Sequence, residues 1–221
     1  MNNDTDKEQM NEKDNYFKLR NVDPSIYKNT ILPIWIKNEK YENVFGVDIE
    51  EPAINHCLDN NLNVLELDLQ NLINPFDFKF DVIIISHVLE HMPKKEIIDT
   101  LKCIKKDFLT IGGKLLIAVP NAQSNTGGYW AYEDWTHTTL FTSGALFYVL
   151  RAAGFETIVF LDVDCTLGKS KTILVTRKIF LFLYKINKSF WNKITGSHYH
   201  GSSPEIFSYE IKAKAINHSK S

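Results

Sequence analysis

An apolar run that leads directly into ionisable side chains, residues 80–91 (FDVIIISHVLEH), constrains the fold of this chain more than any other segment. Val82–Ile85 are consecutive apolar residues, a pattern typical of a strand covered on both faces in a parallel sheet. The polar residues that follow this strand are Ser86, His87, Glu90 and His91. Open α/β sheets bind their ligands at the carboxyl ends of parallel strands. The segment therefore predicts both a buried strand and a candidate site.

The rest of the chain alternates between strand and helix patterns. The predicted strands are residues 43–49, 63–67, 80–85, 114–119, 157–163 and 172–176, and the predicted helices are residues 51–60, 94–109 and 143–153. Residues 121–139 read as a loop rich in aromatic and polar side chains. This alternation indicates an α/β fold with a mostly parallel sheet and helices on both faces.

Composition limits the classes of function. A length of 221 residues suits one domain, and a net charge of −2 gives no reason to expect a nucleic acid partner. Cys57, Cys103 and Cys165 lack metal-ligand spacing, so we expect reduced thiols in a cytoplasmic protein and no metal centre. No apolar run approaches the roughly 20 residues that span a bilayer.

Two blocks carry a resemblance to a known family. The strand at 80–85 with LEH behind it, and GGKLLIAVPN at 112–121, resemble the fourth and fifth strands of class I methyltransferases that use S-adenosylmethionine (SAM). LEH is common in the small-molecule branches of that family. D-W-T-H at 134–137, followed by F-T, resembles methyltransferases of bacterial cell-surface polysaccharide pathways. The resemblance extends from about Tyr16 to Asn217.

The resemblance implies a set of cofactor-binding residues. Asp48, with Ile49 beside it, matches the acid that accepts hydrogen bonds from the ribose hydroxyls of SAM, because a carboxylate can take two donors. Asp68 matches the acid near the adenine amine, and Leu69 would contribute a backbone contact. Ser86 and His87 match the strand end that lines the SAM pocket. An equally good interpretation makes Asp68 a helix cap.

The segment 129–141 (YWAYEDWTHTTLF) carries the candidate acceptor chemistry. Methyl transfer is an in-line displacement, and the enzyme orients the acceptor and removes its proton. His137 is the candidate general base, oriented by Asp134 or Glu133. The aromatic residues that could form a wall against a sugar ring are Tyr129, Trp130, Tyr132 and Trp135. The alternative is a structural lid in which Trp135 packs in the core, His137 caps the helix near Thr142 and His91 fixes a loop.

One expected element is missing. In this family the first strand ends in a glycine-rich turn, DxGxGxG, but only eight residues lie between Trp35 and Val44. A strand–helix–strand crossover takes at least about 30 residues. Either the domain has lost its cofactor loop and is altered or inactive, or the sequence is a truncated form of an active ancestor. Loss of a strand from the sheet centre would expose apolar surface and favour a homodimer or a partner protein.

The chain ends in a basic segment. Residues 169–221 carry 10 Lys and Arg against 2 Asp and Glu, and residues 178–194 predict a basic amphipathic helix. Such a helix suits a peripheral contact with an anionic membrane, although covering the sheet or forming a dimer contact is slightly favoured. Residues 204–215 read as a final edge strand paired with 172–176. The predicted divisions are a disordered 1–15, a methyltransferase-like domain at 16–177 and an appendage at 178–221.

The fold prediction is therefore a Rossmann-like class I methyltransferase sheet, truncated at its first strand. The predicted function is SAM-dependent methyl transfer to an oxygen or nitrogen of a small molecule, a cell-surface carbohydrate or its precursor, impaired by loss of the glycine loop. The alternative is a non-catalytic pseudo-methyltransferase that binds a partner protein. A nicotinamide-dependent sugar enzyme is rejected, since G-x-G-x-x-G is absent and the Y-x-x-x-K match at Tyr184 to Lys188 lies beyond the expected sheet.

Overall fold

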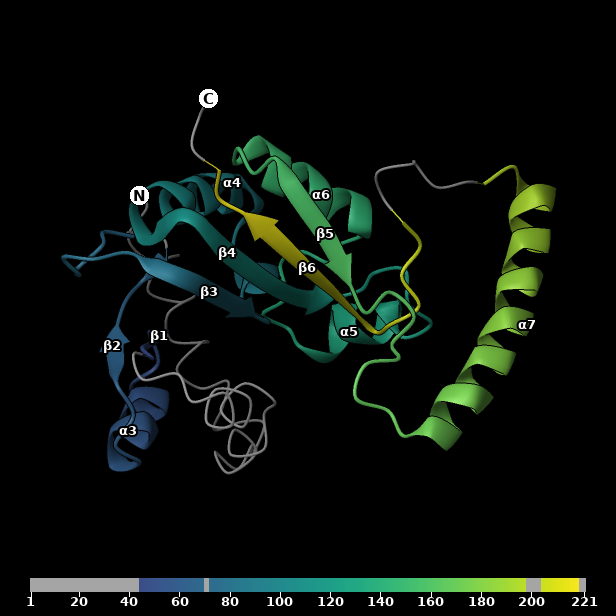
Figure 1. The fold of residues 1–221 in the computed structure, drawn as a ribbon, viewed down its shortest axis with the longest axis horizontal. Coiled ribbons are helices and arrows are strands. Elements are labelled where there is room, and N and C mark those ends of the chain that lie inside the picture. Colours follow the sequence, from purple (N-terminus) through teal and green to yellow (C-terminus); the bar gives the residue numbers. More distant parts are fainter. Residues whose placement is uncertain (1–43, 70–71, 198–203, 219–221) are drawn as a thin grey trace. The chain divides into compact units, whose positions relative to one another are not determined.

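The computed structural model describes residues 44–69, 72–197 and 204–218 (Figure 1). The chain divides into two compact units between Leu72 and Ile73. The predicted disordered stretch 1–15 and the shortened join before Val44 both lie outside the described residues.

The described part of the first unit is one strand–helix–strand repeat. Strands β1 (Gly46–Asp48) and β2 (Val64–Glu66) pair in parallel, and helix α3 (Glu51–Asp59) connects them. Pro52 lies in the first turn of α3, where its missing N–H is not needed. The sequence prediction of this repeat is confirmed, with strands shorter than expected.

The second unit is built on a four-stranded sheet with the order β3-β4-β6-β5. Its strands are β3 (Phe80–Ser86), β4 (Leu109–Pro120), β5 (Thr157–Leu161) and β6 (Glu210–Ile216). β3 and β4 run parallel, whereas β6 is antiparallel to both of its neighbours. The expected mostly parallel sheet is therefore mixed: of the four strand pairings that the structure describes, two are parallel and two antiparallel.

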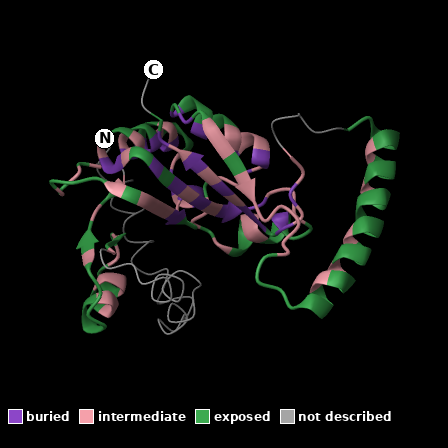
Figure 2. Ribbon diagram, viewed as in Figure 1, coloured by how far each residue is buried: buried purple, intermediate pink, exposed green. Residues whose placement is uncertain are grey.

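Helices α4 (Lys94–Cys103) and α6 (Ser143–Ala152) supply the helical half of the core. The fully buried apolar residues of these helices are Ile97 and Leu101 in α4 and Leu146 and Leu150 in α6. Burial alternates along β4 and β6, so one face of the sheet is covered and the opposite face is partly exposed (Figure 2). β3 was expected to be covered on both faces, but Ile85 is its one buried residue and most of the others are half-buried.

Local signals fix several element ends. The Thr142 side chain accepts a hydrogen bond from the Ala145 N–H and caps α6, and Gly154 takes a φ of +90° just after that helix. The predicted helix at 94–109 instead ends in a π-helical turn, Ile104–Phe108, because Leu109 already begins β4. Helix α5 (Gly127–Glu133) lies in the segment 121–139 that was expected to be a loop, and the short helix η3 (Leu89–His91) follows β3.

Two predictions for the end of the chain are wrong. Residues 172–176 are not a strand, because helix α7 runs unbroken through Lys171–Thr195 and across the expected domain boundary at 177/178. The last strand is not at an edge, because β6 lies between β4 and β5. An appendage cannot begin at residue 178 when β6 completes the sheet. Helix α7 contacts loop residues; for example, the Arg177 side chain donates to the carbonyls of Asp164 and Phe207.

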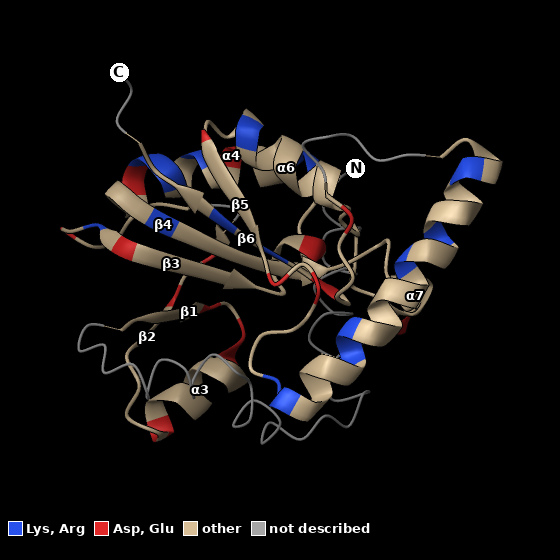
Figure 3. Cartoon of the chain, turned by 45° about the vertical axis from the view of Figure 1, so that its right-hand side comes forward, with Lys and Arg blue, Asp and Glu red and all other residues tan. Residues whose placement is uncertain are grey.

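Helix α7 carries six basic residues and no acidic residue (Figure 3). Among the described residues, no helix has both the length and the hydrophobicity needed to cross a membrane.

Candidate functional site

In the first unit, Asp48 is fixed at the carboxyl end of β1. Its Oδ1 accepts hydrogen bonds from the backbone N–H of Ile49 at 2.8 Å and of Glu50 at 3.0 Å. Its Oδ2 accepts no hydrogen bond from the part of the chain that the structure describes. One carboxylate oxygen is thus used to orient the group while the other stays available to hydroxyl donors.

The second predicted acid follows the neighbouring strand. Asp48 pairs with Glu66 of β2, and the Leu67 N–H donates to the Asp48 carbonyl at 3.0 Å. Asp68 is exposed and Leu69 is half-buried just beyond this point. The parallel pairing therefore brings Asp48 and Asp68 to the same edge of this sheet, at the carboxyl ends of β1 and β2. Residues that hold the ribose and the adenine of one nucleoside would need such an arrangement.

In the second unit, the chain turns sharply after β3. Ser86 is exposed, and His87 adopts a φ of 55° while its N–H donates to the Ala118 carbonyl at 2.9 Å. A residue other than glycine in this left-handed region is strained, and such strain gathers at functional sites. The turn directs the His87 side chain toward two carboxylates.

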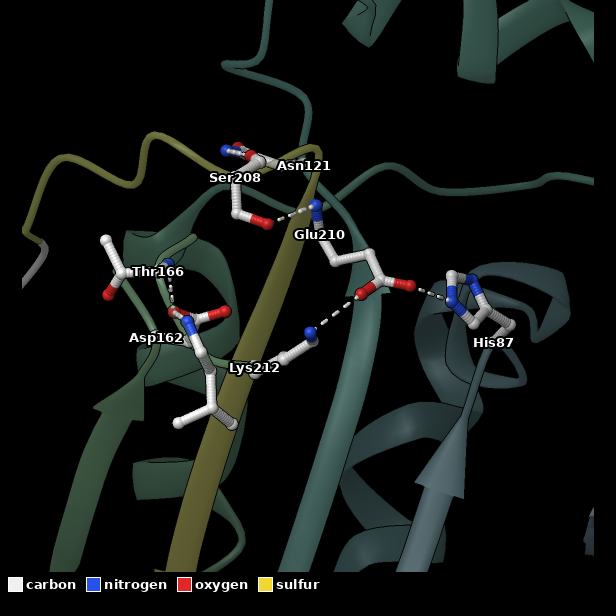
Figure 4. A network of polar contacts seen from close by, with 8 residues as sticks. His87, Asn121, Asp162, Thr166, Ser208, Glu210 and Lys212 are labelled. Carbon is white, nitrogen blue, oxygen red and sulfur yellow. Dashed lines mark hydrogen bonds and ion pairs between the residues drawn. The ribbon is translucent and has the colours of Figure 1, made fainter. Parts of the chain in front are cut away.

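His87 belongs to an ion-pair network in which Glu210 lies between His87 and Lys212 (Figure 4). Its Nε2 is 2.8 Å from Glu210 Oε1, and its Nδ1 is 3.2 Å from Oε1 of the buried Glu90. Lys212 Nζ lies 3.2 Å from the other oxygen of Glu210. Hydrogen bonds to Glu210 and then to Glu90 raise the pKa of His87 to about 9, despite the opposing effect of burial. The imidazole is therefore charged at pH 7.

The same network acts on Glu210 in the opposite direction. Burial alone would raise the pKa of Glu210, but the hydrogen bond from His87 and the charges of His87 and Lys212 outweigh it and lower the pKa to about 2. Sequence reasoning missed Glu210 and Lys212. The alternating pattern at 204–215 identified a strand, but no local signal indicates that this strand ends beside residue 87.

The ion pair between His87 and Glu210 predicts a defined pH dependence of the free energy of unfolding. The His87 pKa is raised from 6.5 to about 9, so its contribution is complete below pH 6.5 and is lost as the pH rises through 9. The Glu210 pKa is lowered from 4.5 to about 2, so its contribution is complete above pH 4.5 and is lost as the pH falls toward 2. Because the His87 side chain is 43% exposed, we expect a contribution of only about 1 kcal/mol.

Urea unfolding of the wild type and of His87→Gln between pH 5 and pH 10 checks this prediction. The difference in unfolding free energy should be largest near pH 5 to 6.5 and should vanish by pH 10. A difference that stays constant across this range would contradict the ion pair.

Two further histidines, His91 and His137, lie close to Glu90. The rings of His91 and His137 are 4.7 Å apart, centroid to centroid. His91 Nδ1 is 2.7 Å from Thr136 Oγ1, and His137 Nδ1 is 2.6 Å from the Trp130 carbonyl oxygen. Burial, as the largest influence, lowers the pKa of His91 and favours its neutral form.

These contacts change the roles expected of the loop residues. The group that orients His137 is the Trp130 carbonyl, whereas the Asp134 carboxylate accepts hydrogen bonds from the backbone N–H and the hydroxyl of Thr136. Asp134 therefore supports His91 through Thr136. The alternative that placed Trp135 in the core is wrong, because that side chain is 84% exposed. Thr142 caps α6 itself.

A cleft of about 740 Å³ lies beside the start of α7. Its basic lining residues are Lys169, Arg177 and Lys188, and its floor includes Tyr184 and Tyr209. Burial and the neighbouring Glu210 charge raise the pKa of Tyr209 to about 12, so Tyr209 lines the cleft as a neutral phenol. The Tyr209 ring lies 6.1 Å from that of Trp130, the residue whose carbonyl holds His137. Sequence reasoning did not find this cleft.

Solved structures resemble this chain in fold. A SAM-dependent methyltransferase from Archaeoglobus fulgidus is 21% identical and aligns over 84% of this chain and 80% of its own, with a TM-score of 0.55. A chain of the complex between the Haloferax volcanii Trm112 methyltransferase activator and a methyltransferase is 14% identical over 85% and 77%, with a TM-score of 0.53. The plantazolicin methyltransferase BpumL is 16% identical over 86% and 73%, with a TM-score of 0.50.

At these identities the likeness establishes the α/β methyltransferase fold. No curated protein matches this chain. Residues 8–159, which are more than half of the sequence, match the family described as a methyltransferase domain, whose methyl donor is SAM. The chain therefore belongs to the methyltransferase domain family, and by family and fold it is a class I SAM-dependent methyltransferase.

Proposed function

We propose that this protein transfers the methyl group of SAM to an oxygen or nitrogen of a small molecule. The observation that carries this proposal is the geometry of His137, whose Nδ1 donates to a carbonyl, so that Nε2 is the nitrogen that holds the lone pair of the neutral ring. A neutral imidazole nitrogen held in this way can accept a proton from an acceptor hydroxyl or amine. The role of the protein is then to orient the acceptor and remove that proton.

The residues of the first unit fit SAM. The Asp48 carboxylate is oriented through Oδ1 and offers Oδ2, as a ribose-binding acid requires. We propose that Asp48 and Ile49 hold the ribose and that Asp68 and Leu69 hold the adenine. For the second unit, we propose Ser86 and His87 as further SAM-binding residues. SAM supplies an electrophilic methyl group for in-line displacement.

The acceptor we propose is a cell-surface carbohydrate or its nucleotide-linked precursor. D-W-T-H at 134–137 supports the carbohydrate, as do the exposed rings of Tyr129, Tyr132 and Trp135 in the same segment. Lys188 Nζ already lies 2.6 Å from Glu205 Oε1, and Arg177 donates to the carbonyls of Asp164 and Phe207. Lys169 in the same lining supports an anionic acceptor, such as a phosphate-linked sugar. A panel of nucleotide sugars, with S-adenosylhomocysteine formation as the readout, would identify the acceptor.

We further propose that this form binds SAM weakly, since the sequence lacks the glycine turn that brings backbone donors to SAM. Each lost hydrogen bond is worth about 1 kcal/mol. At a SAM concentration equal to a millimolar Kd, binding stabilises the protein by about 0.4 kcal/mol, which raises Tm by about 1–2 °C. We expect this shift in the wild type and its loss in Asp48→Ala.

Each other outcome of this thermal unfolding experiment has a distinct meaning. A rise of more than about 5 °C with SAM would contradict a weakened pocket. No shift in a cooperatively unfolding sample would support the non-catalytic alternative, in which the fold binds a partner protein or a second copy. The complex of a related fold with the Trm112 activator supports that alternative by analogy alone.

We also propose that α7 makes a peripheral contact with an anionic membrane surface. Val175, Ile179, Phe182 and Ile186 recur at helical spacing and are each more than half exposed. The opposite side of α7 contacts loops, for example through the Tyr184 ring on Phe207. An exposed apolar stripe on a helix with only basic charges fits a lipid surface with negative head groups.

Co-sedimentation with phosphatidylserine vesicles tests this contact. Binding should fall at least about tenfold in Phe182→Glu, because a carboxylate in the apolar stripe is both desolvated and repelled. Tyr148→Glu, at an exposed aromatic residue of α6, is the matched control and should bind like the wild type. Equal binding of both variants, or a stable dimer that Phe182→Glu dissociates, would overturn the membrane assignment.

A further inference from the structure

We propose that Glu90, His91 and His137 bind a divalent first-row transition-metal ion. The three residues come from η3 and from the turn after α5, and their candidate ligand atoms all lie within 4.8 Å of one another. Ligands of one ion, bound at about 2.0–2.1 Å, are about 3–4 Å apart, so side-chain shifts of roughly 1 Å close the site.

The hydrogen bonds of both histidines leave the metal-binding nitrogen available. The Trp130 carbonyl can only accept, so His137 Nδ1 carries a proton, and in the neutral ring Nε2 holds the lone pair that can bind a metal ion. Thr136 Oγ1 donates its hydrogen to Asp134 Oδ1 at 2.7 Å and therefore accepts from His91 Nδ1. Backbone carbonyls and carboxylate-linked groups behind metal-binding histidines orient the rings in the same way.

Glu90 provides an independent reason to expect a cation. Its side chain is fully buried, and although Oε1 lies 3.2 Å from His87 Nδ1, Oε2 has no hydrogen-bond partner among the described residues. Burying a carboxylate oxygen without a partner is costly. A metal ion between Glu90 and the two imidazoles would compensate that cost.

The backbone holds the two halves of the site together. The Glu90 carbonyl accepts hydrogen bonds from the N–H groups of Thr138 at 2.8 Å and Thr139 at 3.1 Å. The Thr138 hydroxyl adds bonds to the carbonyls of Glu90 and Met92. The segment that carries His137 is therefore fixed against the turn that carries Glu90 and His91, which is the preorganisation a metal site needs.

The ligand set defines the class of metal. Two imidazoles and one carboxylate suit Zn²⁺, Fe²⁺ or Mn²⁺, whereas Mg²⁺ and Ca²⁺ prefer oxygen ligands alone. Three protein ligands leave open positions for an acceptor oxygen. This last step rests on the proposed function and refines it: with metal bound, His137 would be a ligand, and the cation would stabilise the deprotonated acceptor oxygen. The acceptor proton would pass to solvent before the oxygen takes the methyl group from SAM.

Calorimetric titration of the full chain with Zn²⁺, without SAM or acceptor, tests metal binding apart from methyl transfer. We expect one equivalent to bind with a micromolar or lower Kd. Glu90→Gln keeps the shape and removes the charge, and His137→Gln removes one nitrogen; each should weaken binding at least about tenfold. The control is His198→Gln with His200→Gln, which removes another pair of closely spaced histidines and should bind like the wild type.

Absence of a one-equivalent site, or loss of binding only in the control, would overturn the proposal. If Glu90→Gln does not fold, His137→Gln decides, because that side chain is only half-buried. If the protein binds zinc but does not transfer methyl groups, the metal site stands and the proposed function is rejected. If methyl transfer continues in the presence of chelators, the proposed function stands and the metal site is rejected.

Discussion

Replacing Asn121 with alanine is expected to lower the free energy of unfolding by about 3 kcal/mol. Asn121 follows β4 and is fully buried. Its Nδ2 donates to the carbonyls of Ile206 at 3.1 Å and Ser208 at 2.9 Å, and its Oδ1 accepts from the Gln123 N–H at 2.9 Å. The substitution would leave two buried carbonyls without their donor and would release the lead-in to β6.

Thermal unfolding measures this effect directly. For a chain of this size, 3 kcal/mol corresponds to a fall in Tm of about 6–12 °C. Asn125→Ala is the matched control, because Asn125 lies in the same loop but is exposed and makes only a surface hydrogen bond with Tyr184. We expect the control to change stability by less than about 0.5 kcal/mol. Equal effects of the two substitutions would show that Asn121 does not anchor this segment.

Replacing His137 with alanine is expected to lower kcat for methyl transfer by about 10²–10⁴-fold. The reason is loss of the Nε2 lone pair, whether that lone pair takes a proton or binds a metal ion. Because His137 is half-buried and its ring hydrogen bond is to a backbone carbonyl, the fold should survive the substitution. The measurement is S-adenosylhomocysteine formation with the acceptor that the nucleotide-sugar panel identifies.

His218→Ala is the matched control for this experiment. His218 hydrogen-bonds the Thr157 hydroxyl at an exposed position just after β6. Its removal should leave kcat unchanged. A loss of less than tenfold in His137→Ala would exclude His137 from the chemistry. If chelating zinc lowers the kcat of the wild type as much as His137→Ala does, His137 acts as a metal ligand and not as a base.

The sequence was most informative where local pattern and burial agree. The apolar run at 82–85 predicts β3, and the i, i+4 spacing of Ile97 and Leu101 predicts α4. Gly154 marks the end of α6. It was least informative at residues 172–176, where β-branched side chains suggested a strand. No glycine or proline interrupts the chain from Lys171 to Thr195, so the helix extends through that segment.

The sequence likewise predicted some residues of the candidate site and missed others. The polar residues after β3 and the segment 134–137 could be selected from sequence, because they follow recognisable strands and motifs. The partners of His87 and His91 could not. Glu210 is separated from His87 by 123 residues, and Thr136 from His91 by 45.

The sequence by itself thus determined most of the elements, the methyltransferase resemblance and the residue types available for chemistry, since periodicity and short motifs are local properties. Only the tertiary structure decided that β6 inserts between β4 and β5, that Glu210 meets His87, and that Glu90 is buried beside two oriented imidazoles. The physical reason is that strand order and side-chain partners depend on contacts between distant segments. An alternating strand pattern specifies which face is buried and leaves open which strands become its neighbours.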